Sequence, residues 1–222
     1  MSDQRTSVSD GLARELGRMT EDAARNYRGG TKKADLAKGH PNFVERTYEL
    51  WDQLATEQAL RLPIIERPAW KVVKLGAHKN ADSYRQALKK AGYEIGRWAN
   101  DMMGHSNFKI IPKPVDVELV LVTVAELGFP DGATRKDIYE KALSLDLQLC
   151  PPEVGPALRL DYLDQPAGEY LLVAMEPIAG SDGALHVFNV AHDDGPRWLG
   201  SYYGNPGHVW DGSYRWLFVR GK

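Results

Sequence analysis

Apolar side chains in the first part of the chain recur at helical spacing. Between residues 10 and 28 they return every three or four positions, which predicts an amphipathic helix that a pair of glycines ends. Asn42 and Glu45 have the spacing of a capping box and precede a second apolar face, so a second helix is predicted to begin near Asn42. We therefore expect residues 1–66 to form a helical, basic N-terminal region.

A short strand followed by two helices is predicted for residues 67–112. Residues 70–76 are apolar and β-branched before a glycine, as in many strands. From residue 84 to residue 102 the apolar positions keep helical spacing. Because glycine weakens a helix interior, Gly92 is expected to end one helix, and a second is expected to start near Tyr93 and pack at an angle.

The hydrophobic period changes near Val115, from about 3.6 residues to about 2. Residues 115–124 alternate and then become continuously apolar, which predicts a strand buried on both faces. Thr134 is expected to cap a helix that runs to about Leu145. Further strands are predicted at residues 157–162, 170–175, 185–191, 198–203 and 214–220.

The links between these strands are short and rich in Gly, Pro, Asn and Asp, and such links favour an antiparallel meander. The predicted fold class is therefore α+β, with a helical N-terminal half followed by an antiparallel sheet (meander) and one main helix packed on it. We expect the sheet domain to occupy residues 113–222.

The charge on the chain is divided unevenly between its halves. Residues 1–111 hold 19 Lys and Arg against 14 Asp and Glu, a net of +5, whereas residues 112–222 hold 9 against 16, a net of −7. A basic half joined to an acidic half favours two units with different partners, or two units that dock on each other.

Composition narrows the class of protein. No apolar run approaches the roughly 20 residues that span a bilayer, and the polar N-terminus lacks the apolar segment of a secretory signal. We therefore expect a cytoplasmic protein with no membrane partner. The lone Cys150 excludes an internal disulfide framework and a cysteine-rich zinc site. No phosphate-binding glycine loop or recognised metal-ligand spacing is present, so no cofactor and no metal site are predicted.

Several phrases in the chain resemble a recurring, uncharacterised family of bacterial proteins, over about residues 70–222. They are WKVVKLG (70–76), IGRWAND (95–101), ELGF (126–129), LCPPEVGPALRL (149–160), DQPAGE (164–169) and AMEPI (174–178). The family has no established activity, so the resemblance implies none here. Asp146 departs from it, since such sequences usually carry Gly at that place, and a slightly strained helix end is expected.

Histidine and aspartate residues gather in the last forty positions. His186 and His192 lie on one predicted strand, with side chains on the same face, and Asp193, His208 and Asp211 follow them. Such a set is compatible with an acid–base site of a hydrolase or nuclease, or with a metal site. The simpler interpretation is favoured: Asp193 belongs to a polar hairpin loop, and the histidine beside it is exposed.

An enzyme would bring at least two of these five residues within hydrogen-bond reach around a concave pocket. Cys150 is a second candidate, as a nucleophile with one of the histidines as its base. A half-buried structural thiol is favoured instead, because lone cysteines usually pack as small apolar residues.

Aromatic residues are dense near the C-terminus, and one set of them is expected in the core. Trp198, Tyr202 and Trp210 are candidates for a partner surface. A platform that stacks bases needs adjoining positive charge, and this half is acidic, so a protein partner is favoured over nucleic acid. Arg159 is a further candidate, either as a contact to an anion or in a surface ion pair with Glu153.

The basic half leaves nucleic-acid binding open as an alternative. A helix–glycine–helix on a basic background would face nucleic acid with Arg97, but it lacks a basic recognition-helix run. The function expected from the sequence is a non-catalytic bacterial binding or accessory protein, with protein–protein interaction through an acidic, aromatic-rich sheet surface. A hydrolase or nuclease-type enzyme and a nucleic-acid-binding protein are the alternatives.

Overall fold

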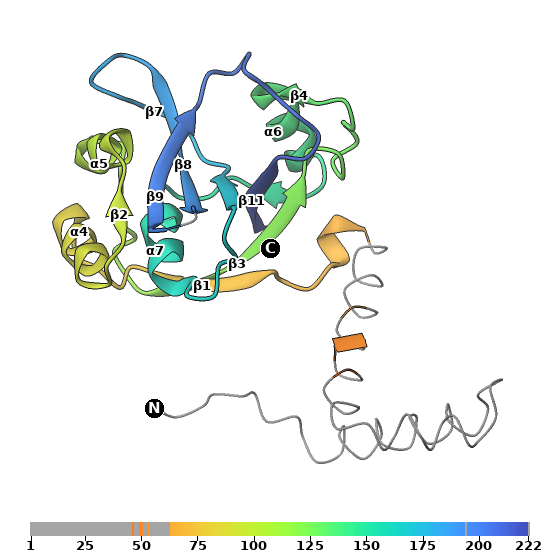
Figure 1. Ribbon diagram of the computed structural model, residues 1–222. Coiled ribbons are helices and arrows are strands. Elements are labelled where there is room, and N and C mark those ends of the chain that lie inside the picture. The colour runs from red at the N-terminus through yellow and green to blue at the C-terminus, as the bar shows by residue number, and fades with distance from the viewer. Residues whose placement is uncertain (1–45, 47–48, 51–52, 54–62, 194, 222) are drawn as a thin grey trace, which may run out of the picture. The chain divides into compact units, whose positions relative to one another are not determined.

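The computed structural model describes residues 46, 49–50, 53, 63–193 and 195–221 (Figure 1). Residues 60–222 form one compact unit, which holds every strand found among the described residues. The helix predicted for residues 10–28 lies outside the described residues. In the stretch predicted as the second helix, the four described positions, Arg46, Glu49, Leu50 and Gln53, are helical.

One mixed sheet of nine strands, curled into a half-barrel, dominates the described part of the chain. Its main path runs β1 (Lys71–Leu75), β3 (Val115–Thr123), β11 (Arg215–Arg220), β6 (Glu169–Val173), β8 (Leu185–His192), β9 (Arg197–Tyr203) and β2 (Glu94–Ile95). The short strands β5 (Leu147–Gln148) and β7 (Ile178–Ala179) pair with β11 and β8. A separate two-stranded sheet joins β10 (Val209–Trp210) to β4 (Ala133–Thr134).

The predicted fold class, a helical half followed by an antiparallel meander with one main helix, is wrong. Strands β6, β8 and β9 are antiparallel neighbours, but β11 pairs with β6 in parallel and β2 pairs with β9 in parallel. Strand β2 lies in a stretch that was expected to be helical, whereas β1 matches the short strand predicted at residues 70–76. Residues 63–221 are mostly sheet, with four short α-helices.

The position of β11 explains the error about the meander. Trp216, Leu217 and Phe218 are all fully buried, so this strand is apolar on both faces. A strand of that kind is stable in the middle of a sheet, where both faces are covered. It therefore inserts between β3 and β6 instead of pairing with β9, its nearest preceding long neighbour in the sequence.

Residues 63–221 hold four α-helices, two of which begin with a side-chain cap. They are α4 (Ala81–Lys90), α5 (Arg97–Gly104), α6 (Arg135–Leu143) and α7 (Val154–Asp161), with a 3-10 turn η1 (Ile64–Glu66) before β1. Asn80 and Ser83 form a capping box at α4. Thr134 caps α6 as predicted, because its hydroxyl accepts a hydrogen bond from the Asp137 N–H at 3.2 Å. None of the described helices has the length and apolar content needed to cross a membrane.

Two helix predictions need correction. Gly92 does follow the end of α4, with a φ of 77°, but β2 comes next, and α5 starts at Arg97 and not near Tyr93. The strand predicted for residues 157–162 is wrong, because this stretch belongs to α7. Its apolar residues repeat at helical spacing, and Gly155 lets the helix approach the sheet closely. A Cβ on Gly155 would lie 2.7 Å from Cγ of Phe188.

The helices cover the two faces of the sheet. Trp98 of α5 stacks on His186, and Gly155 of α7 contacts Phe188, so α5 and α7 lie on the face that carries these two β8 residues. Tyr139 of α6 packs edge-on against Trp216 at 5.6 Å, on the opposite face. Figure 1 shows α4 and α5 on one side of the strands and α6 with β4 on the other.

Candidate functional site

A pocket of about 430 Å³ lies where α5 meets the ends of β8 and β9. Its lining residues are Trp98, Asp182, His186, Ser201, Tyr202 and Tyr203. Pockets of roughly 300 Å³ and above accommodate small molecules or the side chains of a partner. This one combines aromatic rings with a histidine and a carboxylate, so it offers both apolar contact and directed polar groups.

The register of the sheet places these residues. His186 pairs directly with Tyr203 across β8 and β9, so both side chains lie on one face. Ser201 lies two positions along the same strand and shares that face, whereas Tyr202 lies on the other. The β9 residues that line the pocket therefore belong to both faces of the strand.

His186 is a buried polar residue in the wall of the pocket. It is 4% exposed, and its ring stacks on Trp98 with centroids 5.3 Å apart and an interplanar angle of 16°. Its Nε2 lies 3.5 Å from Oδ1 of Asp182, and this buried nitrogen has no hydrogen bond in the structure. Because buried polar atoms are nearly always well hydrogen-bonded, a nitrogen in a pocket wall with only this long contact has capacity for a hydrogen bond with a bound group.

Asp182 lies in the turn between β7 and β8. Its Oδ1 accepts a hydrogen bond from the Ala184 N–H at 3.0 Å. Loss of solvent around the carboxyl raises its pKa, but the Ala184 N–H and the nearby His186 outweigh this effect, and the pKa of Asp182 is lowered. The carboxylate is therefore ionised near neutral pH and supplies negative charge to the pocket.

Two further features hold this corner together. A Cβ on Gly180 would lie 2.7 Å from Oδ1 of Asp182 and 3.1 Å from Nε2 of His186, so glycine is needed for the turn to approach the histidine. Asp101 of α5 accepts a hydrogen bond of 2.6 Å from the Ser181 N–H, which ties the helix to the same turn. A smaller pocket of about 290 Å³ lies on this side of the turn and includes Asp101.

The pocket continues into an aromatic cluster, which we define as Tyr202, Tyr203, His208, Trp210, Tyr214 and Trp216. Trp210 is buried and lies 5.0 Å from the Tyr202 ring and 5.1 Å from the Trp216 ring. Tyr202 and Tyr203 are 37% and 55% exposed. The two tyrosines are thus accessible and rest on a packed aromatic base, so they lose little conformational freedom when a partner covers them.

The structure does not bring together the histidine and aspartate residues that the sequence placed in one site. His186 and His192 lie at opposite ends of β8. His192 Nδ1 lies 2.6 Å from the Gln165 carbonyl oxygen, and Asp193 accepts a hydrogen bond from the Tyr170 hydroxyl.

The other two members of that set lie near the pocket end of the molecule. His208 packs against Tyr203 and Trp210, and Asp211 accepts a hydrogen bond of 2.9 Å from the Ser213 N–H. No hydrogen bond or ion pair joins any two of the five predicted residues, all of which the structure describes. The described residues also contain no group of three or more His, Cys, Asp or Glu that is arranged to hold a metal ion.

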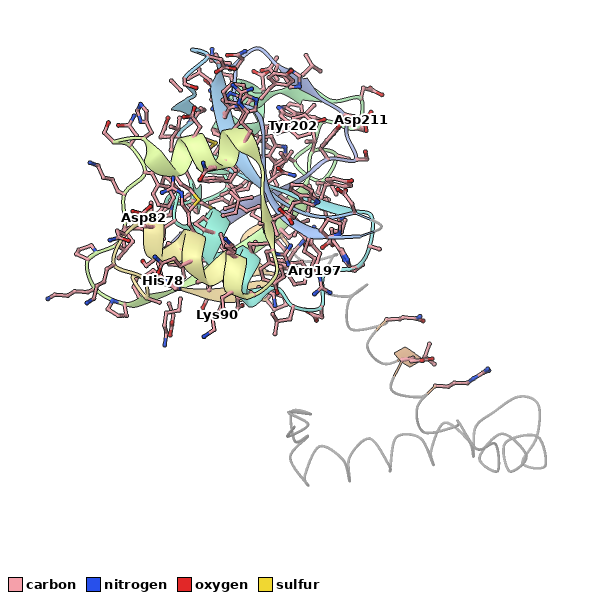
Figure 2. All side chains as sticks on the ribbon, turned by 60° about the vertical axis from the view of Figure 1, so that its left-hand side comes forward. His78, Asp82, Lys90, Arg197, Tyr202 and Asp211 are labelled. Atoms are coloured by element: carbon pink, nitrogen blue, oxygen red, sulfur yellow. The ribbon has the colours of Figure 1, made fainter. Side chains whose placement is uncertain are left out.

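Of the predicted binding residues, Tyr202 and Arg97 lie at the pocket, and the others do not line it. Tyr202 lines the pocket, and Arg97 stacks on the Trp98 ring in its wall at 4.7 Å. Trp198 is partly buried on the same face as Tyr202. Trp210 is buried under the surface and supports Tyr202 without being exposed itself. Figure 2 shows Tyr202 and Asp211 at one end of the molecule, away from Arg197.

Arg159 is also buried, so the predicted surface ion pair between Arg159 and Glu153 is wrong. The Arg159 guanidinium donates to the Tyr162 carbonyl oxygen and to Oε1 of Gln165, and its burial lowers the pKa to about 10. The error follows from the helix α7, which turns both side chains into the core. A strand would have placed them at the rim of the sheet.

Cys150 is buried as well. Its thiol donates a hydrogen bond of 3.3 Å to the Leu217 carbonyl oxygen. Burial raises the pKa of the Cys150 thiol well above its ordinary value, so the thiolate needed for nucleophilic attack does not form near neutral pH. The packing role favoured from the sequence agrees with this position.

Sequence reasoning missed four of the residues that line the pocket: Trp98, Asp182, Ser201 and Tyr203. Trp98 was recognised as part of an apolar helical stripe, and Asp182 as part of a glycine-rich turn. No sequence signal connects the two, because α5 and the β7–β8 turn are far apart in the chain and meet only in the folded sheet.

Comparison with known proteins adds no assignment to this geometry. No model of a protein family matches the chain, and no curated protein and no solved structure matches it significantly.

Proposed function

We propose that this chain is a non-catalytic binding protein whose partner is another protein, held at the pocket and at the exposed tyrosines beside it. The observation that carries this proposal is the buried Nε2 of His186, which has only a long contact of 3.5 Å with Oδ1 of Asp182, in the wall of a pocket that opens next to Tyr202 and Tyr203. Such a nitrogen gains a hydrogen bond when a partner group enters, which makes binding favourable and directional.

Binding is favoured over catalysis by what the pocket residues lack. A hydroxyl nucleophile needs a base within hydrogen-bond reach. Ser201, Tyr202 and Tyr203 are the hydroxyl residues among the lining residues, and no hydrogen bond joins any of them to Nε2 of His186. The thiol of Cys150 is buried and protonated. The described lining residues therefore offer a surface for contact and no activated nucleophile.

A protein partner is favoured over nucleic acid by the charge and the residue types. The pocket lies mainly in the half of the chain whose net charge is −7, and Asp182 adds an ionised carboxylate to its wall. Nucleic acid requires a positive field. Tyrosine and tryptophan are enriched in the residues that dominate protein interfaces. Val209, next to Trp210, adds an apolar side chain that is 63% exposed.

The proposal is tested by affinity capture from the native cells with the full-length tagged protein, followed by reconstitution with the purified captured protein. We expect Tyr203→Ser to weaken binding at least about tenfold, which corresponds to about 1.4 kcal/mol. Tyr170→Ser is the matched control, because Tyr170 is 47% exposed on a strand of the same sheet but outside the pocket.

Circular dichroism establishes that both variants keep the fold. A reconstituted partner that binds both variants as well as the original protein would contradict the proposal. Capture of nucleic acid, with an affinity that falls steeply as salt rises, would favour the nucleic-acid alternative instead.

A further inference from the structure

We propose that the partner binds as an extended segment, which adds to the free edge of β9 at Ser201 and Tyr203 and places a lysine or arginine side chain in the pocket. This inference rests on the proposed function and specifies both the mode of binding and the chemistry of the partner.

The outer edge of β9 is paired only over its first part. Strand β2 aligns Glu94 with Trp198 and Ile95 with Leu199. The Gly96 N–H then donates a hydrogen bond of 2.9 Å to the Leu199 carbonyl oxygen. After Gly96 the chain turns into α5, and no described strand continues along the rest of β9.

The backbone groups of Ser201 and Tyr203 point toward this edge. The Gly204 N–H donates to the Leu185 carbonyl oxygen on β8 at 2.6 Å, so the even-numbered positions at this end of β9 face β8. Because successive residues of a strand alternate, Ser201 and Tyr203 face outward. Their N–H and C=O groups have no hydrogen bond with any described residue. Such a row of free donors and acceptors is the feature that strand addition uses.

The pocket lies where a side chain of an added strand would go. Side chains of a strand alternate between the two faces of the sheet. On the face of Ser201 and Tyr203, a side chain from the added strand meets His186 and the Trp98 ring behind it. The next side chain falls on the opposite face, beside Tyr202. Both positions therefore have a contact surface.

The chemistry of the pocket selects a cation. Asp182 is ionised, and the Tyr203 ring, which is 55% exposed, offers an electron-rich face that attracts positive charge. An ammonium or guanidinium group is also a donor, and the Asp182 carboxylate accepts its hydrogen bonds. The positive charge of Arg97 repels a second cation. Arg97 is already stacked on Trp98, however, and the two negative charges of Asp101 and Asp182 exceed its single positive charge.

The test starts from a library of phage-displayed linear random peptides, selected on the full-length protein. We expect the enriched peptides to share a lysine or arginine, flanked at alternating positions by β-branched or aromatic residues. Isothermal titration with a synthetic selected peptide then measures affinity. Replacing its basic residue by alanine, or Asp182 by asparagine in the protein, is expected to weaken binding at least about tenfold.

Strand addition is tested from both sides of the contact. Ser201→Pro removes an N–H that points to the free edge and leaves the hydrogen bonds between β8 and β9 in place. It is expected to weaken binding at least about tenfold, whereas Ser201→Ala, which keeps the N–H, is expected to bind normally. On the peptide, N-methylation of alternate amides is expected to abolish binding at the positions that face β9 and not between them.

Each result decides one part of the inference. If the selected peptides need Tyr203 for binding but contain no basic residue, the proposed lysine or arginine in the pocket is wrong. The proposed function is unaffected by that result. Equal tolerance of N-methylation at every amide, with normal binding by Ser201→Pro, would overturn strand addition. Enrichment of no peptide, or of peptides that bind Trp98→Ala unchanged, would overturn the whole inference, and affinity capture would then decide the proposed function separately.

Discussion

Tyr84 donates a hydrogen bond of 2.7 Å from its hydroxyl to Oε1 of Glu153, and both side chains are fully buried. The same carboxylate accepts from the Gly76 N–H at 2.8 Å and from the Ile111 N–H at 2.7 Å. Glu153 thus connects the start of α7 to α4, to the end of β1 and to the segment before β3. A buried carboxylate is tolerated only when it is well hydrogen-bonded, and three donors meet that need.

Glu153→Gln should destabilise the fold, because the amide nitrogen donates where the carboxylate oxygen accepted. At least one of the three donors then faces another donor. We expect the free energy of unfolding to fall by about 2–3 kcal/mol, measured by urea denaturation. Glu176→Gln is the control, since Glu176 is exposed, and it should change stability by less than about 0.5 kcal/mol. Equal stability of the two variants would contradict the role of Glu153.

Protonation of Glu126 should lower the free energy of unfolding at acid pH. Its partial burial raises the pKa, but the Thr123 N–H at 2.7 Å and the Arg67 guanidinium at 2.6 Å outweigh this, and the pKa of Glu126 lies below its ordinary value of 4.5. The unfolded chain therefore binds the proton more tightly than the folded protein. The contribution is complete above the unfolded pKa and is lost as pH falls through the folded one.

We expect Glu126→Gln to lower the free energy of unfolding at neutral pH by about 1 kcal/mol. The difference from the original protein should shrink to nothing as the pH falls below the folded pKa of this carboxyl. Urea denaturation at a series of pH values measures it. A difference that stays the same at every pH would show that the variant acts through packing and not through the charge of Glu126.

Replacing Asp146 by glycine should stabilise the folded protein. Its φ is 58°, in the left-handed region, where a residue with a side chain costs about 1 kcal/mol more than glycine. Glycine also makes the unfolded chain more flexible, which offsets part of the gain. We expect Asp146→Gly to raise the free energy of unfolding by about 0.5 kcal/mol. Asp131→Gly, in a turn without positive φ, should lower it, and a loss of stability in both variants would refute the strain.

Gly155→Ala should be poorly tolerated, because the added Cβ would lie within 2.9 Å of three atoms of Phe188. Overpacking of this kind costs about 1–3 kcal/mol, which thermal unfolding detects. Gly207→Ala is the matched control, since nothing lies within 4 Å of its added Cβ. The double variant with Phe188→Leu should recover part of the loss, and strictly additive effects would argue against this contact.

Local patterns were enough to find most of the strands. Alternating or continuous apolar runs predicted β1, β3, β6, β8, β9 and β11 within a few residues of their observed bounds. They failed at α7, where a strand was predicted at residues 157–162, although Pro151 and Pro152 precede the stretch. Prolines are tolerated just before and in the first turn of a helix, because the N–H groups there have no partner within the helix.

The candidate site was predicted only in part. Tyr202 and His186 were identified as chemically distinctive, and both line the pocket, as does Trp98, the ring on which Arg97 stacks. Asp182 was not weighed as a partner of His186, although it lies only four residues before it. A carboxylate in a turn is ordinary, and its approach to His186 depends on the shape of the turn at Gly180.

The sequence by itself determined the local structure, the division of charge and the aromatic richness of the last strands, because these depend on neighbouring residues and on simple counts. The order of the strands, the parallel pairing of β11 and the free edge of β9 were decided only by the tertiary structure. The reason is physical: which strand occupies the middle of a sheet depends on how all apolar faces are buried at once. The pocket likewise exists only because α5 and β8, distant in the chain, pack against each other.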